Sequence, residues 1–527
     1  MNVTKTDAWQ KLAQHASKVT QTPLIDFVQD ETRHTRLCLE LADCRFDFSK
    51  QRIDTESLDA LLELVSTTEL LEHRDAMLAG EPINTSEQRA VLHTALRTDK
   101  FVKDEALKAD VAEVLNRMRT MANAIRSGEW LGHTGKRITD VVHIGIGGSH
   151  LGPQVVIDAL NEYSTTDINV HFVSNIDAND LHNALKGLNS ETTLFIIASK
   201  SFTTLETQIN ANSARSWFLE RAGDLAAIAK HFVAVSNNIA AAGEFGLSED
   251  NLLPMWDSVG GRFSLWSAVG LPILIKLGEE NHQALLQGAA ELDEHFATSA
   301  PQSNVAILGG LLAIWNYNFL GAGSLAVLSY DNRLASLPDY LQQLEMESTG
   351  KRVDRDGAPV DFHTMPILWG GVGTNGQHAY HQLLHQGTRA YSADFIIVAE
   401  DDRDQPEHHN WLIANALAQS QAMAQGFEAP SNESYREVPG NHPSSIMTLK
   451  RLSPRSLGAL LAFYEHKVFV QAAIWNINAF DQWGVELGKK MANPIYAALK
   501  DQNQDSSIDA STLKLINDLK NTQNSLK

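Results

Sequence analysis

The apolar residues of the N-terminal part recur at helical spacing. Over the first 115 residues this spacing, clearest in the leucine and valine stripe at 58–65, predicts a helical N-terminal region. Within it, Thr85 and Gln88 have the spacing of a capping box and predict a helix over 86–97.

From residue 140 the pattern changes to short, β-branched apolar runs that end in glycine or small polar residues. Helix-like segments separate these runs, and such alternation predicts a parallel sheet with helices on both faces. A helical stretch near 281–320 precedes a second series of runs, so we expect a second α/β domain, a boundary near residue 280 and helices after the last strand. The expected strands lie at 141–149, 168–175, 193–201 and 231–236, then at 324–330, 359–371 and 392–400.

The chain therefore divides into four expected parts. The N-terminal helical region is expected to pack on the second α/β domain. In the polar tail, Leu513, Ile516 and Leu519 predict a short amphipathic helix suited to docking on a partner. The four parts span residues 1–115, 116–280, 281–499 and 500–527.

Composition indicates a globular chain with a strong acidic balance. The 527 residues are 43% hydrophobic and 20% charged, which gives ample material for a core. Lysine plus arginine total 43 and aspartate plus glutamate 64, so the net charge is −21. This argues against broad nucleic-acid binding, which needs a basic face, but permits a small basic pocket for an anionic metabolite.

Cysteine usage and the N-terminal sequence favour a cytoplasmic protein. Cys38 and Cys44 are the only cysteines, too few for a disulfide framework or a cysteine-rich zinc site, as expected in a reducing cytosol. The first residues lack the apolar core of a signal peptide, and no run reaches about 18 apolar residues. We therefore expect a soluble protein without a membrane span.

Two loops that follow predicted strands are suited to an anion. The glycines of 145–148 allow backbone amides to approach an anion, and Ser149 adds a hydroxyl. The second loop, 199–204, combines four hydroxyls with Lys200 before a helix, as a phosphomonoester requires. The alternatives are a tight turn without function and hydroxyls that only cap the helix.

The segment Gly371–Gly376 fits a dinucleotide fingerprint, and Asp401 follows at about the position of a ribose-binding acid. A lone fingerprint is weak evidence, because the polar residues around it also suit another functional loop. Three histidines, His378, His381 and His385, follow on one predicted helical face and could bind a metal, although no carboxylate accompanies them at a ligand-like spacing.

Other polar residues suit acid–base chemistry. On a regular helix Glu347 would continue an apolar stripe, where desolvation raises a carboxylate pKa toward that of a general base, whereas Glu345 would be solvated. Glu347 could equally be a helix-end residue paired with Lys351. Arg262 follows two glycines, which leave room for its guanidinium to reach an anion. On a helix Gln482, Glu486 and Lys489 would share a face. The alternative is a surface ion pair between Glu486 and Lys489, which contributes little.

Together these segments resemble the phosphoglucose isomerase (glucose-6-phosphate isomerase) family. The motifs occur in the family's order between about residues 84 and 490, and the two segments by which the family is usually recognised are among them. The resemblance identifies GTNGQH as a catalytic-histidine loop rather than a dinucleotide site. The matching segments are LHTALR, GIGGSHLGP, ASKSFTTLET, DSVGGRFSLWSAVG, QQLEMESTGK, GTNGQHAYHQLLHQGT and FDQWGVELGKK.

The resemblance implies two sugar-isomerase-type α/β domains, no metal or other cofactor, and a homodimer with shared active sites. It implies reversible conversion of glucose 6-phosphate to fructose 6-phosphate through a cis-enediol, in glycolysis and gluconeogenesis. By position, Glu347 resembles the base, Arg262 the group that stabilises the enediolate, and His378 from the neighbouring subunit the ring-opening residue, assisted by Lys489. The implied substrate-binding residues are Gly148, Ser149, Ser199, Lys200, Ser201 and Thr204 at the phosphate and Gln343 and Gln482 near the sugar. Ser201 stands where many members have threonine.

Two alternatives stay open at this point. The protein could be an isomerase that also accepts mannose 6-phosphate, which differs only in the stereochemistry at C2. It could instead be a sugar-phosphate-binding regulator without catalysis, although a regulator has no need of a base and a ring-opening residue.

Overall fold

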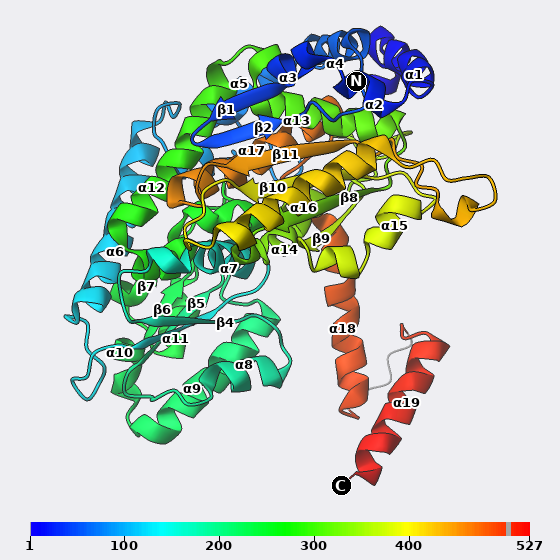
Figure 1. The fold of residues 1–527 in the computed structure, drawn as a ribbon. Coiled ribbons are helices and arrows are strands. Elements are labelled where there is room, and N and C mark those ends of the chain that lie inside the picture. Colours follow the sequence, from blue (N-terminus) through cyan, green and yellow to red (C-terminus); the bar gives the residue numbers. More distant parts are fainter. Residues whose placement is uncertain (1, 502–506, 527) are drawn as a thin grey trace. The chain divides into compact units, whose positions relative to one another are not determined.

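The computed structural model describes residues 2–501 and 507–526, and the chain forms two compact units (Figure 1). The first unit extends to Ala479 and the second begins at Phe480. In the described ranges, no helix combines the length and apolar character needed to cross a membrane.

The first sheet of the large unit is entirely parallel, with strand order β4-β3-β5-β6-β7. The four strands expected from the sequence are confirmed, and the two-residue β7 is additional. The sheet's strands are β3 (Asp140–Ile144), β4 (Asn169–Val173), β5 (Thr193–Ala198), β6 (Phe232–Val235) and β7 (Leu252–Leu253).

Both faces of this sheet are buried, because alternate residues of its strands contribute to two different cores. On β5, Leu194 and Ile196 join the core that includes residues of the long helices α6 and α12, whereas Phe195 and Ile197 face the core under α8, α9 and α11. The predicted parallel sheet with helices on both faces is confirmed. Its helices are α6 (Glu105–Ser127), α7 (Gly148–Leu160), α8 (Ala178–Leu185), α9 (Leu205–Ala222), α10 (Ile228–His231), α11 (Ile239–Phe245) and α12 (Leu271–Thr298).

The second sheet has the order β1-β2-β11-β10-β8-β9, and its last four strands are parallel. The three strands expected here are confirmed in shortened form, but β11 follows α16, so the expectation of helices alone after β10 is wrong. The strands are β8 (Ser324–Tyr330), β9 (Ile367–Val372), β10 (Ser392–Val398) and β11 (Ser444–Leu449). The helices around this sheet are α13 (Val305–Ile314), α14 (Leu337–Leu341), α15 (His381–Gln386), α16 (Pro406–Gln425) and α17 (Pro454–Ile474).

The N-terminal region is not purely helical. Between its helices an antiparallel hairpin, β1 (Cys38–Leu41) and β2 (Cys44–Asp47), extends the second sheet because β2 pairs with β11 (Figure 1). The turn residues Ala42 and Asp43 both have positive φ, 51° and 62°, a conformation usually signalled by Asn-Gly, so the sequence gives little warning of it. The helices are α1 (Asp7–Val19), α2 (Leu24–Val28), α3 (Glu31–Leu37), α4 (Thr55–Thr67) and α5 (Leu70–Leu78).

The helix expected over 86–97 is absent. Asn84 and Arg89 instead exchange backbone hydrogen bonds of 3.1 and 3.2 Å, and Gln88 between them has φ of 55°, which is incompatible with a helix. Only a short 3₁₀ turn, Thr94–Leu96, follows.

The expected boundary near residue 280 falls inside α12. This helix is kinked at Gly278, where φ is 83° and ψ is 171°, and the residues on both sides of Gly278 are helical.

The small unit contains α18 (Glu486–Leu499) and α19 (Ala510–Ser525), which pack on each other. The amphipathic helix expected in the tail is confirmed, with Ile516 buried and Leu519 exposed.

Candidate active site

The winding of the first sheet brings the two predicted anion loops together. The chain passes from β3 to β4 on one side and then crosses to β5 on the other, so the loops after β3 and β5 leave their adjacent strands in opposite directions. Ligands of open parallel sheets bind at such switch points, beyond the carboxyl ends of the strands. A Cβ on Gly145 would lie 3.3 Å from the Ala198 carbonyl oxygen, so the two loops are neighbours.

The glycine loop also contacts the arginine segment and Gln343. A Cβ on Gly148 would lie only 1.9 Å from the Gly261 carbonyl oxygen, so only glycine allows this approach of two backbones. Gly147 has φ of 59°, and a Cβ there would lie 3.0 Å from Gln343 Nε2. Segments separated by up to about 200 residues therefore meet at the N-terminus of α7, where Ser149 is part of the first turn.

The hydroxyls of the second loop are not used as helix caps. Thr204 is the N-cap residue of α9, but its side chain makes no capping hydrogen bond, and Ser199 Oγ donates to Thr204 Oγ1 at 3.2 Å. Ser201 Oγ accepts hydrogen bonds from Thr203. The half-buried Lys200 has its Nζ 3.6 Å from Asp257 Oδ1. The loop thus keeps a cation and hydroxyls beside a helix N-terminus, which suits an anion.

Glu347 pairs with Arg262. Arg262 Nη1 lies 3.4 Å from Glu347 Oε1, and 21% of the Glu347 side chain is exposed, so the carboxylate is next to a cation but still accessible. The buried guanidinium also donates to Ser348 Oγ at 2.6 Å and to the Ala479 carbonyl oxygen. Arg262 is therefore held in a fixed orientation.

The expectation that Glu345 is solvated is wrong. Glu345 is fully buried, and Lys467 Nζ donates to its two oxygens at 3.0 and 3.2 Å. Burial raises the pKa of the Glu345 carboxyl, and Lys467 opposes this rise. The cause of the error is the winding of Gln342–Glu347, which forms a π-helical turn instead of a regular α-helical one, so the predicted faces do not hold.

The glycines of the dinucleotide-like segment serve packing. A Cβ on Gly373 would lie 2.4 Å from the Tyr330 ring, and one on Gly376 would lie 2.3 Å from the Tyr380 hydroxyl. Asp401 accepts hydrogen bonds from the backbone N–H groups of Arg403 and Gln405, which closes a turn. These contacts account for the pattern without a dinucleotide.

The three histidines do not converge on one point. His381 Nδ1 and His385 Nε2 lie 3.0 and 2.7 Å from Gln419 Oε1, whereas His378 is exposed at the end of the 3₁₀ turn Gly376–His378. The exposed ring of His378 is accessible to a substrate or to a second protein copy.

In the small unit, Gln482 does not share a helical face with Glu486 and Lys489. Gln482 precedes the 3₁₀ turn Trp483–Val485 with φ of −151°, so the predicted face is wrong for this residue. Lys489 and Glu486 form the exposed ion pair considered above, at 3.2 Å. The place of Gln482 and Lys489 at the site stays a prediction.

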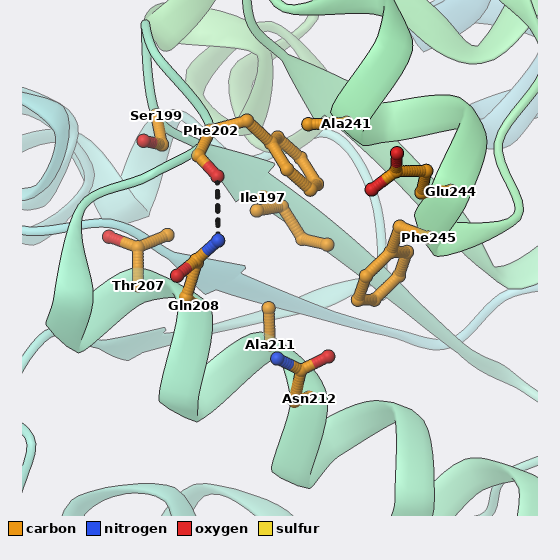
Figure 2. A pocket seen from close by; sticks show the side chains of 10 residues that line it. All are labelled: Ile197, Ser199, Phe202, Thr207, Gln208, Ala211, Asn212, Ala241, Glu244 and Phe245. Carbon is orange, nitrogen blue, oxygen red and sulfur yellow. Dashed lines mark hydrogen bonds between the residues drawn. The ribbon is translucent and has the colours of Figure 1, made fainter.

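A cavity of about 200 Å³ lies behind the second anion loop (Figure 2). The rings of Phe202 and Phe245 meet there edge to face at 5.8 Å, and Gln208 Nε2 donates to the Phe202 carbonyl oxygen at 3.2 Å. Of the predicted site residues, only Ser199 lines it, so this cavity is separate from the junction of Gly148, Gln343 and Arg262.

Residue-based reasoning missed two partners of site residues, Ser348 and Asp257. Both lie inside the motifs that carried the resemblance, directly beside Glu347 and at the start of the arginine segment. The signal that could have found Ser348 and Asp257 is their position within these motifs.

Comparison with known proteins identifies the family. A model of the family described as phosphoglucose isomerase matches residues 47–516. The chain belongs to this family. The resemblance seen in the sequence is thus confirmed, and the protein is assigned to the isomerases.

Individual relatives agree over nearly the whole length. The protein is 46% identical to a glucose-6-phosphate isomerase of Shewanella baltica over 98% of both chains. It is also 46% identical to one of Hahella chejuensis, over 97% of this chain and 96% of that one. The crystal structure of a glucose-6-phosphate isomerase from Chlamydia trachomatis matches with a TM-score of 0.88 at 34% identity, covering 98% of this chain and 100% of that chain.

Proposed function

We propose that this protein interconverts D-glucose 6-phosphate and D-fructose 6-phosphate in glycolysis and gluconeogenesis, as a cytoplasmic homodimer. The observation that carries the proposal is the Glu347–Arg262 pair at 3.4 Å, in a segment whose Gln343 borders the glycine loop. A base and a cation beside an anion site are what an aldose–ketose isomerisation needs.

In this proposal the loops after β3 and β5 hold the phosphate. Gly148 and Ser149 at the start of α7, together with Ser199, Lys200, Ser201 and Thr204, supply N–H groups, hydroxyls and one positive charge. Gln343 and Gln482 contact the sugar. Because the phosphate takes no part in the chemistry, its binding serves to position C1 and C2 against the base.

Glu347 removes the proton from C2 of the open-chain aldose and returns it to C1. The C2–H bond breaks, a C1–H bond forms, and the hydroxyl proton of O2 is transferred to O1, so the two sugars differ only in the place of the carbonyl. The reaction passes through a cis-enediol, and the negative charge of its enediolate form faces the fixed Arg262 guanidinium.

His378 and Lys489 open the sugar ring before this step. The exposure of His378 supports a role toward a neighbouring subunit, since an exposed ring in one chain is available to the site of another. The reaction needs no metal or other cofactor in this scheme.

The deciding experiment follows fructose 6-phosphate in a coupled assay without an added metal. We expect formation of glucose 6-phosphate, and a folded Glu347→Gln variant should lose it. A folded wild-type protein that binds the sugar phosphate without converting it would instead support the regulator alternative.

A further inference from the structure

Three side chains near the N-terminus bring together the donor atoms that zinc prefers. In residues 2–501 and 507–526, His34, Cys38 and Asp47 form the one group of three metal-ligating side chains whose donor atoms all lie within 4.8 Å of one another. The catalytic proposal above uses none of them.

Secondary structure explains how the three residues meet. His34 is in the last turn of α3, and Cys38 follows four residues later as the first residue of β1. Cys38 lies directly opposite Asp47 in the antiparallel register of β1 and β2, so the two side chains share a face of the hairpin.

The histidine and the carboxylate have the separation that two ligands of one tetrahedral ion have. Two donor atoms held about 2.0–2.3 Å from one ion at tetrahedral angles lie roughly 3.3–3.8 Å apart. His34 Nε2 and Asp47 Oδ2 are 3.5 Å apart. Asp47 Oδ1 accepts the Ser49 backbone N–H at 2.8 Å, which fixes the carboxylate so that its other oxygen is directed at the histidine.

The surrounding charges do not block a cation. Arg45, on the same face of the hairpin, donates to Glu40 and is thereby neutralised. Each of the three guanidinium nitrogens of the buried Arg33 donates to a backbone carbonyl, of Ser49, Gln51 and Ile53. Asp47 is left to interact with an incoming cation.

We propose that His34, Cys38 and Asp47 bind one zinc ion, which leaves a fourth coordination position for water. The donor set of one imidazole, one thiolate and one carboxylate favours zinc over calcium or magnesium, which prefer oxygen alone. The ion joins α3 to the hairpin that extends the second sheet.

Binding is an exchange of the thiol proton for the metal. A free cysteine has a pKa of about 8.5, so near neutral pH the sulfur carries a proton when no cation is bound. Zinc takes its place on sulfur, one proton is released to solvent, and no oxidant or reductant is required.

Cobalt(II) is the probe of choice, because its bond to a thiolate absorbs in the near ultraviolet and cobalt accepts zinc sites. Chelator-treated full-length protein is titrated with CoCl₂. We expect one equivalent to produce the thiolate band and an equivalent of ZnCl₂ to displace it.

The hairpin supplies its own matched control. Cys44 lies on the neighbouring strand but is buried and donates to the Ser456 carbonyl oxygen. Cys38→Ala should abolish the band, and His34→Gln should weaken cobalt binding at least tenfold, whereas Cys44→Ala should leave the band unchanged.

Thermal unfolding gives a second readout. Zinc should raise the Tm of the wild type and of Cys44→Ala but not that of Cys38→Ala, because a ligand that binds only the folded state stabilises it. No thiolate band in the folded wild type, or a band that survives Cys38→Ala, would overturn the proposal.

Discussion

The two sheets of the large unit are wound alike but have different loops at the equivalent place. In the first sheet the chain passes from β3 to β4 and then crosses to β5 and β6 on the other side. In the second it passes from β8 to β9 and crosses to β10 and β11 in the same way. Each sheet therefore has one switch point, between β3 and β5 and between β8 and β10.

The first switch point carries glycines, hydroxyls and Lys200, whereas the second carries opposite charges that pair with each other. Arg333, after β8, donates to Asp331 at 2.9 and 2.6 Å and to Asp402, after β10, at 2.5 Å. The hydrogen bond to Asp331 raises the pKa of Arg333. A cleft of about 940 Å³ lies there, but its cations are already neutralised by neighbouring carboxylates.

The difference shows that sheet winding decides where a site can form and that the loop residues decide its chemistry. Glycines let backbone N–H groups and a helix N-terminus approach an anion. Lys200 has only a long contact of 3.6 Å with the exposed Asp257, so more of its charge is available. The same crevice filled with ion pairs offers no comparable site for a phosphate. Removing a charged side chain at the first switch point should therefore change the kinetics of the enzyme more than removing one at the second.

The largest effect is expected from Glu347→Gln. The amide keeps the size of the side chain but cannot accept the C2 proton, so isomerisation should fall by about 10²–10⁴-fold, the usual contribution of general acid–base catalysis. Ring opening should persist, and exchange of solvent deuterium into C2 should stop. Coupled assays and NMR of the sugar measure these quantities.

Asp402→Asn is the matched control, since it alters a carboxylate at the second switch point and should leave kcat within about twofold. Continued C2 exchange in folded Glu347→Gln would place the base elsewhere. Glu345 is then an unsuitable replacement, because it is buried against Lys467.

A second large effect tests whether two chains share a site. Mixtures of inactive His378→Ala and inactive Glu347→Gln chains should regain activity, because each mixed dimer would contain one complete site. Random exchange gives half mixed dimers with half their sites complete, so recovery should approach about a quarter of the wild-type rate. If the mixture stays inactive after subunit exchange has been verified, His378 acts in the active site of its own chain.

A smaller effect is expected from removing the cation of the first switch point. Lys200→Ala should raise KM for fructose 6-phosphate about 10- to 100-fold, corresponding to the ~1.5–3 kcal/mol of a hydrogen bond to a charged group, and should change kcat little. Arg403→Ala removes an exposed cation that lines the second cleft and should leave KM unchanged. Equal KM values for wild type and Lys200→Ala would contradict the anion-binding role of the loop 199–204.

The smallest effect is expected from metal removal. Prolonged EDTA treatment should leave kcat and KM unchanged, because the proposed zinc site on the hairpin is not part of the catalytic scheme. If activity is lost and then restored by zinc or manganese, this prediction is wrong, and His381 and His385 become the candidate ligands of a catalytic metal.

Sequence alone predicted the parts of the fold with strong local signals. The β-branched runs of β3, β5 and β10 are buried on both faces, so they read as strands without tertiary information. β11 was missed because its buried residues begin with Ser444 and Ser445, which leaves a short apolar run. The hairpin turn at Ala42 and Asp43 is adopted for tertiary reasons that no local pattern encodes.

In the candidate site, too, the features with a local sequence signal were predicted and those that depend on long-range packing were not. The loops around Gly148 and Ser199 were found because the residue types required by an anion lie next to each other in the sequence. The contact of Gly148 with Gly261 and the pairing of Arg262 with Ser348 depend on long-range packing. The direction of Glu345 was misjudged because a regular helix was assumed where a π-helical turn occurs.

The π-helical turn also makes this segment unusually sensitive to chain length. A π turn closes its hydrogen bond one residue later than an α turn, so it accommodates an extra residue within a continuous helix. Deleting Met346 would let the helix return to regular winding with its flanking residues in place, and the residues beside the deletion, Glu347 among them, would take new directions. Glu347 would then turn away from Arg262 although no chemical group of the site had been removed.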